Sequence, residues 1–474
     1  MEEQLVSSCY KGHTEIIKTY LTNPLTDINT TDSDDRTLLY IACFLGHIEI
    51  VKLLLNDERI KINKVRNNGA TSLYVACQNG RLEIVKLLLN DQSIEINKSN
   101  RESQTPFWIA CCKGKKEIVR LLLNDERTEI NKSDRYNKTP LYIACEKGRI
   151  GVVRLLLSDP RADIRKANCY GETPFYIACQ YGHIEIVKLL LNDERVDVNQ
   201  STNEETSPFW IACEKGHIEI VKLLLNDIRT ETNLMNRYDR VTPFFIACQR
   251  RHLDIVKLLL DEERIDVNKA RSNDETVFWV ACRDGQLEIV RILLNSERVD
   301  VNKGDYHQTP FYIACRDEQI EIVKLLLNSK RIDVNKGTPT GNTPFWIACK
   351  KGNLEVIQNI LVSEREVDLN AKNNGGKTGI DIAREERRRD EWESECKYQE
   401  RKINCPKIVK LLESFQRDPS KTKYKLNIKL GLLGNQYFIY FFYFVFFIFI
   451  FIFILFLFLF LLLLLLLFLF FYLF

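Results

Sequence analysis

The chain has 474 residues, with 67 lysines and arginines against 64 aspartates and glutamates, a net charge of +3 and 45% hydrophobic residues. Charge this close to balance argues against a general nucleic-acid-binding surface, which needs an excess of positive charge on one face. All charges lie in residues 1–429, whereas residues 437–474 are exclusively Phe, Leu, Ile, Tyr and Val. The sequence therefore predicts a soluble body followed by a segment that water does not accommodate.

The cysteines indicate the compartment. Most of the 15 recur from Cys9 to Cys349 at a spacing of 33 to 35 residues, and only Cys112, Cys169, Cys396 and Cys405 lie off this spacing. Equivalent sites in successive units do not approach each other as disulfide partners must, so we expect free, buried thiols in a reducing compartment. The start of the chain, Met1-Glu2-Glu3-Gln4, has no basic and apolar leader pattern, and we expect cytoplasmic repeats without a cleaved signal peptide.

An internal repeat governs the body of the chain. An alanine precedes each regularly spaced cysteine, from Ala42 to Ala348, and Ala383 continues the series. A period of this size is typical of stacked supersecondary units, none of which buries its apolar face alone.

Residues 173–199 illustrate the first half of one unit. Thr173 and Pro174 suit the cap and first position of a helix, and residues 175–179 are apolar on nearly every side. Gly182-His183 then marks a turn. This pattern predicts a short helix enclosed by its neighbours.

The second half of the unit reads as an amphipathic helix. Apolar residues recur at helical spacing over residues 184–191, which predicts one buried stripe. Residues 192–195, Asn-Asp-Glu-Arg, end this helix, and residues 196–199 lead in extended form into a polar loop.

The motif Thr-Pro-Phe-x-Ile-Ala-Cys, followed by Gly-His-Ile-Glu-Ile-Val-Lys-Leu-Leu-Leu and Asp-Val-Asn, resembles the ankyrin repeat. The resemblance covers residues 2–416, with ten clear copies between Asn29 and Asn370 and a degenerate copy at each end. It implies an all-α solenoid of twelve helix–turn–helix units with finger loops. It also implies a non-catalytic scaffold that binds partner proteins through a concave surface.

The chain departs from the ankyrin pattern at two places. An aromatic residue replaces the usual histidine, so we expect any hydrogen bond of that histidine to be lost and aromatic packing to replace it. These residues are Tyr40, Tyr74, Trp108, Tyr142, Tyr176, Trp210, Phe245, Trp279, Tyr312 and Trp346. The glycine that closes the second helix is also absent, and we expect the asparagine of Asn-Asp-Glu-Arg to take the left-handed cap conformation instead.

The pattern changes towards the C-terminus. We expect a final repeat whose two helices are separated by a charged helical insertion that ends before Cys405-Pro406. The predicted organisation is a degenerate repeat at 1–28, ten repeats at 29–370, a capping repeat at 371–416 with the insertion at 384–405, a basic linker at 417–436 and a hydrophobic tail at 437–474.

The spacing Cys-x3-His occurs in five repeats and raises the question of a metal. Zinc needs four ligands that converge at about 2.0–2.3 Å, whereas helix packing separates equivalent pairs in neighbouring repeats by about 8–10 Å. We therefore expect no metal site. No phosphate-binding loop or nucleophile motif is present in the sequence, so we also expect no catalytic residue and no cofactor.

Partner-binding residues are sought where the repeats differ from one another, because the scaffold does not require those side chains. They gather in the loop before each Thr-Pro and in the pair after each Ala-Cys. Tyrosine recurs at one loop position, either as an exposed anchor or packed on the next loop. The candidates are Arg135, Tyr136, Lys138, Glu146, Lys147, Tyr170, Gln180, Tyr181, Tyr238, Gln249, Arg250, Arg283, Asp284 and Tyr306.

Residues 437–474 are open to two interpretations. As one helix they would extend about 57 Å, more than the ~30 Å hydrocarbon core, and the preceding lysines match the cytoplasmic excess of positive charge. The tail then anchors the repeats to a lipid bilayer, or forms part of an oligomeric channel or transport subunit. Alternatively the tail is a gene-model artefact, because T-rich DNA read as coding gives this composition, and the scaffold is entirely soluble.

Overall fold

The structure is a computed structural model that describes residues 2–385 and 394–432, together with residues 445–448, 450, 454, 461 and 465. The chain divides into two compact units, Met1–Ser272 and Asn273–Phe474. The secondary structure of the described residues is helical apart from an isolated bridge between Thr31 and Thr37. The predicted all-α helix–turn–helix solenoid is thus confirmed for this part of the chain.

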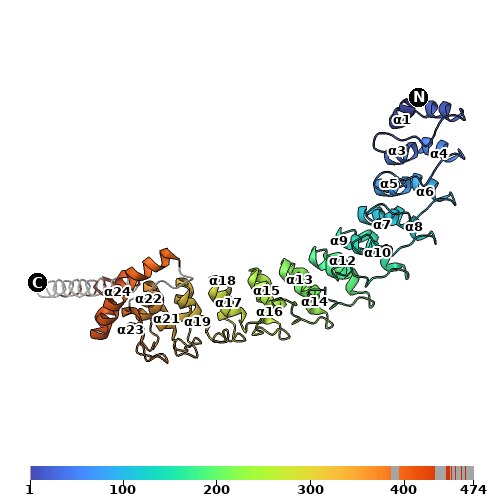
Figure 1. Cartoon of the computed structure of the whole chain (residues 1–474). Helices are drawn as coiled ribbons and strands as arrows, with labels where there is room; N and C mark the ends of the chain where they lie inside the picture. The colour runs from blue at the N-terminus through green and yellow to red at the C-terminus, as the bar shows by residue number, and fades with distance from the viewer. Residues whose placement is uncertain are drawn as a thin grey trace, which may run out of the picture. The chain divides into compact units, whose positions relative to one another are not determined.

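In the unit Met1–Ser272, the helices come in pairs, one pair to a repeat. First helices pack on first helices (α3, α5, α7), and second helices on second helices (α4, α6, α8), so that they form two rows (Figure 1). The helices are α1 Glu2–Lys11, α2 Thr14–Leu21, α3 Leu38–Leu45, α4 Ile48–Leu55, α5 Ser72–Asn79, α6 Leu82–Leu89, α7 Pro106–Lys113, α8 Lys116–Leu123, α9 Pro140–Glu146, α10 Ile150–Ser158, α11 Pro174–Gln180, α12 Ile184–Leu191, α13 Pro208–Lys215, α14 Ile218–Asn226, α15 Pro243–Gln249 and α16 Leu253–Asp261.

The unit Asn273–Phe474 continues the same pairing and adds two longer helices. Its first helices α17, α19, α21 and α23 pack in sequence, and α24 and α25 pack on α22. The helices are α17 Val277–Arg283, α18 Leu287–Leu294, α19 Pro310–Arg316, α20 Ile320–Leu327, α21 Pro344–Lys351, α22 Leu354–Val362, α23 Gly379–Arg384, α24 Glu395–Arg417 and α25 Pro419–Lys429.

Each first helix from α3 to α23 begins at a hydroxyl cap. The Thr173 hydroxyl oxygen accepts a hydrogen bond of 3.0 Å from the Tyr176 amide, and Pro174 occupies the first helical position. Such a cap stabilises a helix by about 1 kcal/mol. Helix α11 is then buried on all sides, since Phe175, Ala178 and Cys179 are at most 1% exposed.

The second helices from α4 to α20 each bury a single stripe, whereas α22, on which α24 and α25 pack, is buried throughout residues 356–361. In α12, Ile186, Val187 and Leu190 are buried, while the exposed Glu185 and Lys188 form an ion pair of 2.7 Å. Two rows of helices with these patterns give a core that runs between them, as the apolar spacing predicts.

The turn between the two helices also joins neighbouring repeats. Gly182 has φ +75°, and a Cβ atom on the equivalent Gly148 would lie 2.8 Å from the ring of His183. The His183 Nε2 group donates a hydrogen bond of 3.1 Å to the Glu146 carbonyl of the preceding repeat. The glycine therefore makes room for the histidine of the next turn.

The expectation that the aromatic substitutions lose a hydrogen bond is wrong for Tyr74, Trp108, Tyr142, Tyr176 and Trp210, whereas the buried indole N–H groups of Trp279 and Trp346 have no hydrogen-bond partner among the described residues. The hydroxyl of Tyr142 donates to the Glu172 carboxylate at 2.7 Å, and the Trp108 Nε1 group donates to the Lys138 carbonyl at 2.9 Å. Both partners lie in the loop of the following repeat. A large ring on the buried helix is long enough for its polar tip to reach that loop.

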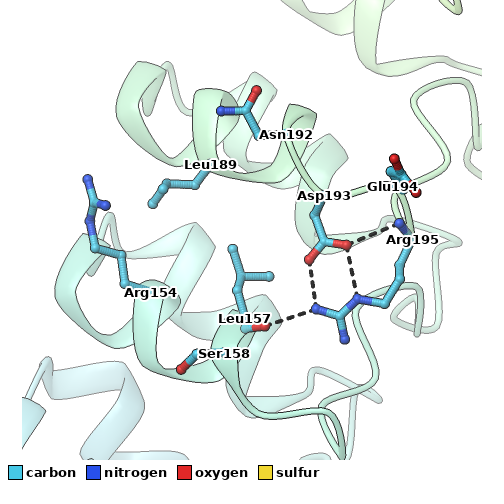
Figure 2. A pocket seen from close by; sticks show the side chains of 8 residues that line it. All are labelled: Arg154, Leu157, Ser158, Leu189, Asn192, Asp193, Glu194 and Arg195. Atoms are coloured by element: carbon cyan, nitrogen blue, oxygen red, sulfur yellow. Dashed lines mark hydrogen bonds and ion pairs between the residues drawn. The ribbon is translucent and has the colours of Figure 1, made fainter.

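The expected left-handed asparagine cap is also wrong. Asn192 has φ −78° and ψ −6°, which is right-handed. The end of a second helix is closed instead by an arginine of the next repeat. Arg195, whose guanidinium is held by Asp193 at 2.7 Å, donates a hydrogen bond of 3.0 Å to the Leu157 carbonyl at the end of α10 (Figure 2). We call this arrangement the arginine clamp.

The arginine clamp recurs through the unit Met1–Ser272. In each copy, Asp-x-Arg follows the second helix, and the arginine donates to a leucine carbonyl at the end of the previous second helix. The copies are Asp57–Arg59 to Leu21, Asp125–Arg127 to Leu89, Asp159–Arg161 to Leu123, Asp193–Arg195 to Leu157 and Asp227–Arg229 to Leu191.

The asparagine after four of these five clamps makes a second link between repeats, and Arg165 takes its place after Asp159–Arg161. The Asn131 side chain donates to the Arg161 carbonyl at 2.7 Å and accepts from the Asp163 amide at 2.9 Å. Because both bonds go to backbone groups of the next repeat, they fix the register of the two loops.

The C-terminal cap differs from the expected organisation. Helix α24 continues through Pro406 and includes the predicted second helix of the last repeat, rather than ending before Cys405. Pro406 and Lys402 lie on the exposed side of this helix, while Ile408 and Leu412 anchor it in the core. The predicted linker 417–436 contains helix α25, whose Thr422 and Leu426 are buried.

The membrane expectation concerns residues that are mostly outside this description. Among the described residues, no helix combines the length and apolarity that crossing a bilayer requires. The tail 437–474 falls outside the described residues except for 445–448, 450, 454, 461 and 465.

Candidate functional site

The loops before successive first helices are joined by backbone hydrogen bonds. The Arg135 amide donates to the Glu102 carbonyl, the Cys169 amide to Tyr136 and the Asn203 amide to Tyr170, each at 3.0 Å. This ladder brings the tips of neighbouring loops side by side in the unit Met1–Ser272.

Each loop is held in shape by one side chain. The Asp134 carboxylate accepts hydrogen bonds from the amides of Tyr136 and Lys138 at 3.0 and 2.9 Å. Asn168 does the same for Tyr170 and Glu172 in the next loop. Tyr136 and Tyr170 therefore project from turns that side-chain hydrogen bonds hold in shape.

The loop tyrosines are exposed to different extents. In the unit Met1–Ser272, Tyr136 is 41% exposed, Tyr170 59% and Tyr238 71%, and in the other unit Tyr306 is 65% exposed. Their rings are thus open to solvent rather than buried on the next loop. Their role as anchors for a partner stays a prediction.

Arg135 and Tyr136 form a pair at one loop tip. The guanidinium lies 4.8 Å from the centre of the tyrosine ring and forms an ion pair of 2.7 Å with Glu102 of the preceding loop. Its hydrogen bond to the Tyr136 hydroxyl raises the pKa of Arg135 above its ordinary value. The arginine holds the ring in one orientation.

Lys138 and Glu146, also predicted as binding residues, lie in an internal network. Only 8% of the Glu146 side chain is exposed, and it is paired at 2.7 Å with both Lys138 and Lys147. Although burial opposes its ionisation, the hydrogen bonds from the two lysines hold the pKa of Glu146 below its ordinary value. Lys147, 45% exposed, is the member of the network that faces solvent.

The same arrangement recurs at the ends of α13 and α15. Glu214, 13% exposed, pairs with Lys215 at 3.1 Å and with Arg250 at 2.7 Å, and these two cations are 43% and 55% exposed. Gln249 beside Arg250 is exposed. Sequence reasoning missed Glu214 because nothing in the pattern marks a carboxylate as covered by its neighbours.

The end of α11 carries an aromatic residue in place of a cation. Tyr181 is 53% exposed and stacks on His183 with the ring centres 6.2 Å apart. The Gln180 carbonyl accepts a hydrogen bond of 2.9 Å from His217, so its backbone belongs to the scaffold. Phe44, at the corresponding end of α3, is 42% exposed and was not predicted.

In the unit Asn273–Phe474, the predicted residues form a separate group. Arg283 pairs with Asp284 at 2.8 Å and lies 5.1 Å from the ring centre of Trp279. The ring centre of Tyr306 lies 6.2 Å from that of His307. Here charge and aromatic surface lie on α17 and on the loop before α19.

The cysteine and histidine pairs do not form ligand sets in the described residues. The Cys179 thiol is fully buried, and burial raises its pKa well above the ordinary value, whereas His183 lies in the turn and bonds a carbonyl. Within the described ranges no group of three or more potential ligands is close enough to hold a metal ion. The described cysteines are free.

The hollow between α10 and α12 belongs to the arginine clamp. Its lining includes Leu157, Asp193 and Arg195, which bond to one another, while Arg154 lies on its opposite side (Figure 2). Asp193 and Arg195 therefore serve to join two repeats.

These paired helices and joined loops define a helical repeat protein. A family model described as "Ankyrin repeats (3 copies)" matches residues 5–100, 92–168, 152–236, 228–305 and 297–373. The chain therefore belongs to the ankyrin repeat family, whose members serve in general as protein-interaction scaffolds. No match was found among curated proteins.

Proposed function

We propose that the chain is a non-catalytic scaffold that binds another protein through the concave ankyrin surface formed by the loop tips and the ends of the first helices. One observation carries this proposal: exposed tyrosines project from loops that backbone hydrogen bonds join into a row. We call this row, with the adjoining ends of α9, α11, α13 and α15, the loop-tip surface.

Tyrosine suits such a surface for energetic reasons. A tyrosine ring buries a large apolar area and loses little conformational entropy on binding, because it has few rotatable bonds. Aromatic residues dominate the energetics of protein interfaces for this reason. Tyr136 is ordered in advance by Arg135, which lowers the entropy cost further.

The charges beside the tyrosines favour a partner segment that carries carboxylates. At the ends of α9 and α13 the carboxylates are covered, whereas the cations are about half exposed. A partner therefore meets lysine and arginine before it meets Glu146 or Glu214. Opposite charge on the partner speeds association and fixes its register.

Affinity capture tests the proposal on the full chain in detergent. The wild type is compared with a variant carrying Tyr136→Ala, Tyr170→Ala and Tyr238→Ala, and we expect partners of the wild type to be lost from the variant. The matched control carries Leu25→Ala and Ile228→Ala, which remove two side chains that are 91% exposed away from the loop tips. Identical partners for wild type and tyrosine variant would refute the loop-tip surface.

We further propose that the tail tethers the scaffold to a membrane, with the repeats in the cytoplasm. The support is the sequence alone: residues 437–474 are wholly apolar, and lysines precede them. The tethered chain resists carbonate extraction, and protease added to intact vesicles digests the repeats. If the measured mass of the natural protein corresponds to an end near Lys429, the tail is not present, and this proposal is wrong.

A further inference from the structure

Helix α25, Pro419–Lys429, is folded onto the end of the repeats rather than extending from it. Thr422 and Leu426 are each 5% exposed, and the Lys423 ammonium donates a hydrogen bond of 2.9 Å to the Ser363 carbonyl at the end of α22. The Asp418 carboxylate caps the helix by accepting from the Lys421 amide at 2.9 Å. These contacts fix which side of α25 faces outward.

The outward side of α25 carries two parallel rows of side chains. Lys421, Lys425 and Lys429 are spaced by four residues and are exposed. The second row consists of Tyr424 and Ile428, which are 49% and 55% exposed, and it is followed beyond the helix end by Leu432, which is 54% exposed. Residues four apart lie on one face of a helix, so the rows run side by side.

The charge of this side is of one sign. Asp418 engages its carboxylate in the helix cap, and no acidic residue follows it in the sequence. The cationic row is therefore not neutralised by carboxylates on its own helix. The last acidic residue of α24, Glu413, is paired with Arg384 at 2.8 Å.

We propose that this side of α25, which we call the α25 face, docks on the surface of an anionic lipid bilayer. Lysines at such a surface pair with anionic headgroups, and the adjacent apolar row enters the boundary with the acyl chains. A bilayer is favoured over a protein groove because the chain beyond Lys429 has no charged residue and ends in residues 437–474, which are all apolar. The α25 face then orients the repeats against the membrane.

The α25 face acts independently of the loop-tip surface. It consists of exposed side chains on the C-terminal cap, and no residue of the partner-binding proposal belongs to it. It also makes a claim that the tail alone does not make, since a hydrophobic tail has no preference for anionic headgroups.

The experiment uses residues 1–432, which hold every buried apolar side chain of the described residues, from Leu5 to Leu426. Circular dichroism and a cooperative thermal transition first establish that this part of the chain is folded. Vesicle co-sedimentation compares phosphatidylserine–phosphatidylcholine vesicles with phosphatidylcholine alone. Each lysine at an anionic surface contributes roughly a fivefold factor, so the variant Lys421→Gln, Lys425→Gln, Lys429→Gln binds about a hundredfold more weakly. Added salt weakens wild-type binding, because it screens these charges.

The matched control removes the same charge elsewhere. Lys52→Gln, Lys86→Gln and Lys188→Gln replace lysines that are 47–48% exposed on second helices. We expect this control to bind phosphatidylserine vesicles as the wild type does. Equal binding by the α25 variant and this control would overturn the proposal, as would wild-type binding without preference for phosphatidylserine.

A second variant tests the apolar row. Tyr424→Ser, Ile428→Ser and Leu432→Ser change exposed side chains only, so the fold is retained, and circular dichroism checks this. We expect weaker binding with the salt dependence preserved. Unchanged binding would mean that the apolar row faces a protein or another part of the chain, which also overturns a bilayer as its occupant.

Discussion

The guanidinium of Arg195 donates a hydrogen bond of 3.0 Å to the carbonyl oxygen of Leu157, 38 residues earlier in the chain. Leu157 lies in the last turn of α10, where carbonyl groups have no partner within the helix. A positive charge is also favourable at that end of a helix. The arginine therefore closes the helix of one repeat from the loop of the next.

Arg195→Ala should lower the free energy of unfolding by about 1 kcal/mol, the value for a net hydrogen bond, since solvent screening at 42% exposure reduces the contribution of charge. Urea unfolding measures the difference. Arg154→Ala is the control, because Arg154 lines the same hollow on its exposed side (Figure 2). Equal loss in both variants would show that the clamp contributes nothing specific.

The clamps also predict a dependence of stability on pH. The hydrogen bond from the arginine two residues later lowers the pKa of Asp125, Asp159, Asp193 and Asp227 in the folded chain. A lowered folded-state pKa stabilises the fold above the unfolded value of about 3.9, and this contribution is lost as pH falls through the folded-state value.

We therefore expect the melting temperature to decrease when the pH is lowered past about 4. A variant with all four aspartates changed to asparagine should be less stable at neutral pH and should lose less on acidification. Thermal unfolding across this range measures both effects. Parallel profiles for wild type and variant would contradict the assigned role of the aspartates.

Tyr142→Phe tests the hydrogen bonds made by the aromatic residues. The change removes a hydroxyl that donates to Glu172 and accepts from Asn168, and should cost about 1 kcal/mol. Tyr170→Phe, on a ring that is 59% exposed, should leave the free energy of unfolding unchanged. If the two variants have the same free energy of unfolding, the Tyr142 hydroxyl does not stabilise the fold, and the contribution of this residue comes from packing of its ring.

Leu426→Ala tests whether α25 is docked on the cap. Leu426 is 5% exposed, and truncating a buried leucine costs about 2–5 kcal/mol. Ile428→Ala, on the outward side and 55% exposed, should cost little. Unfolding followed by tryptophan fluorescence compares the two variants. If Leu426→Ala lowers the free energy of unfolding no more than Ile428→Ala does, α25 does not pack as described.

Much of this fold can be predicted from the sequence, because helix spacing and turn signals are local. Thr173-Pro174 marks a helix start, and the apolar stripe of residues 184–191 marks a buried face. The period of the cysteines indicates a stack, and the described cysteines are free as expected.

The arginine clamp could not be predicted in this way, because its acceptor is a backbone carbonyl of another repeat. The covered state of Glu146 and Glu214 likewise depends on cations brought in by folding. Pro406 read as a helix end because proline disrupts isolated helices, whereas Ile408 and Leu412 secure α24 by packing. Local patterns identify elements, and contacts between repeats decide their ends.

The most direct test of the loop-tip surface is site-specific photo-crosslinking on the full chain. A benzophenone amino acid replaces Tyr136, Tyr170 or Tyr238 in turn, and Lys188 or Lys222 on the second helices in the control proteins. We predict that the captured partner crosslinks from the three loop positions and not from the two lysine positions. Crosslinks from Lys188 and Lys222 with none from the loops would contradict the account, because the partner would then occupy the second-helix face.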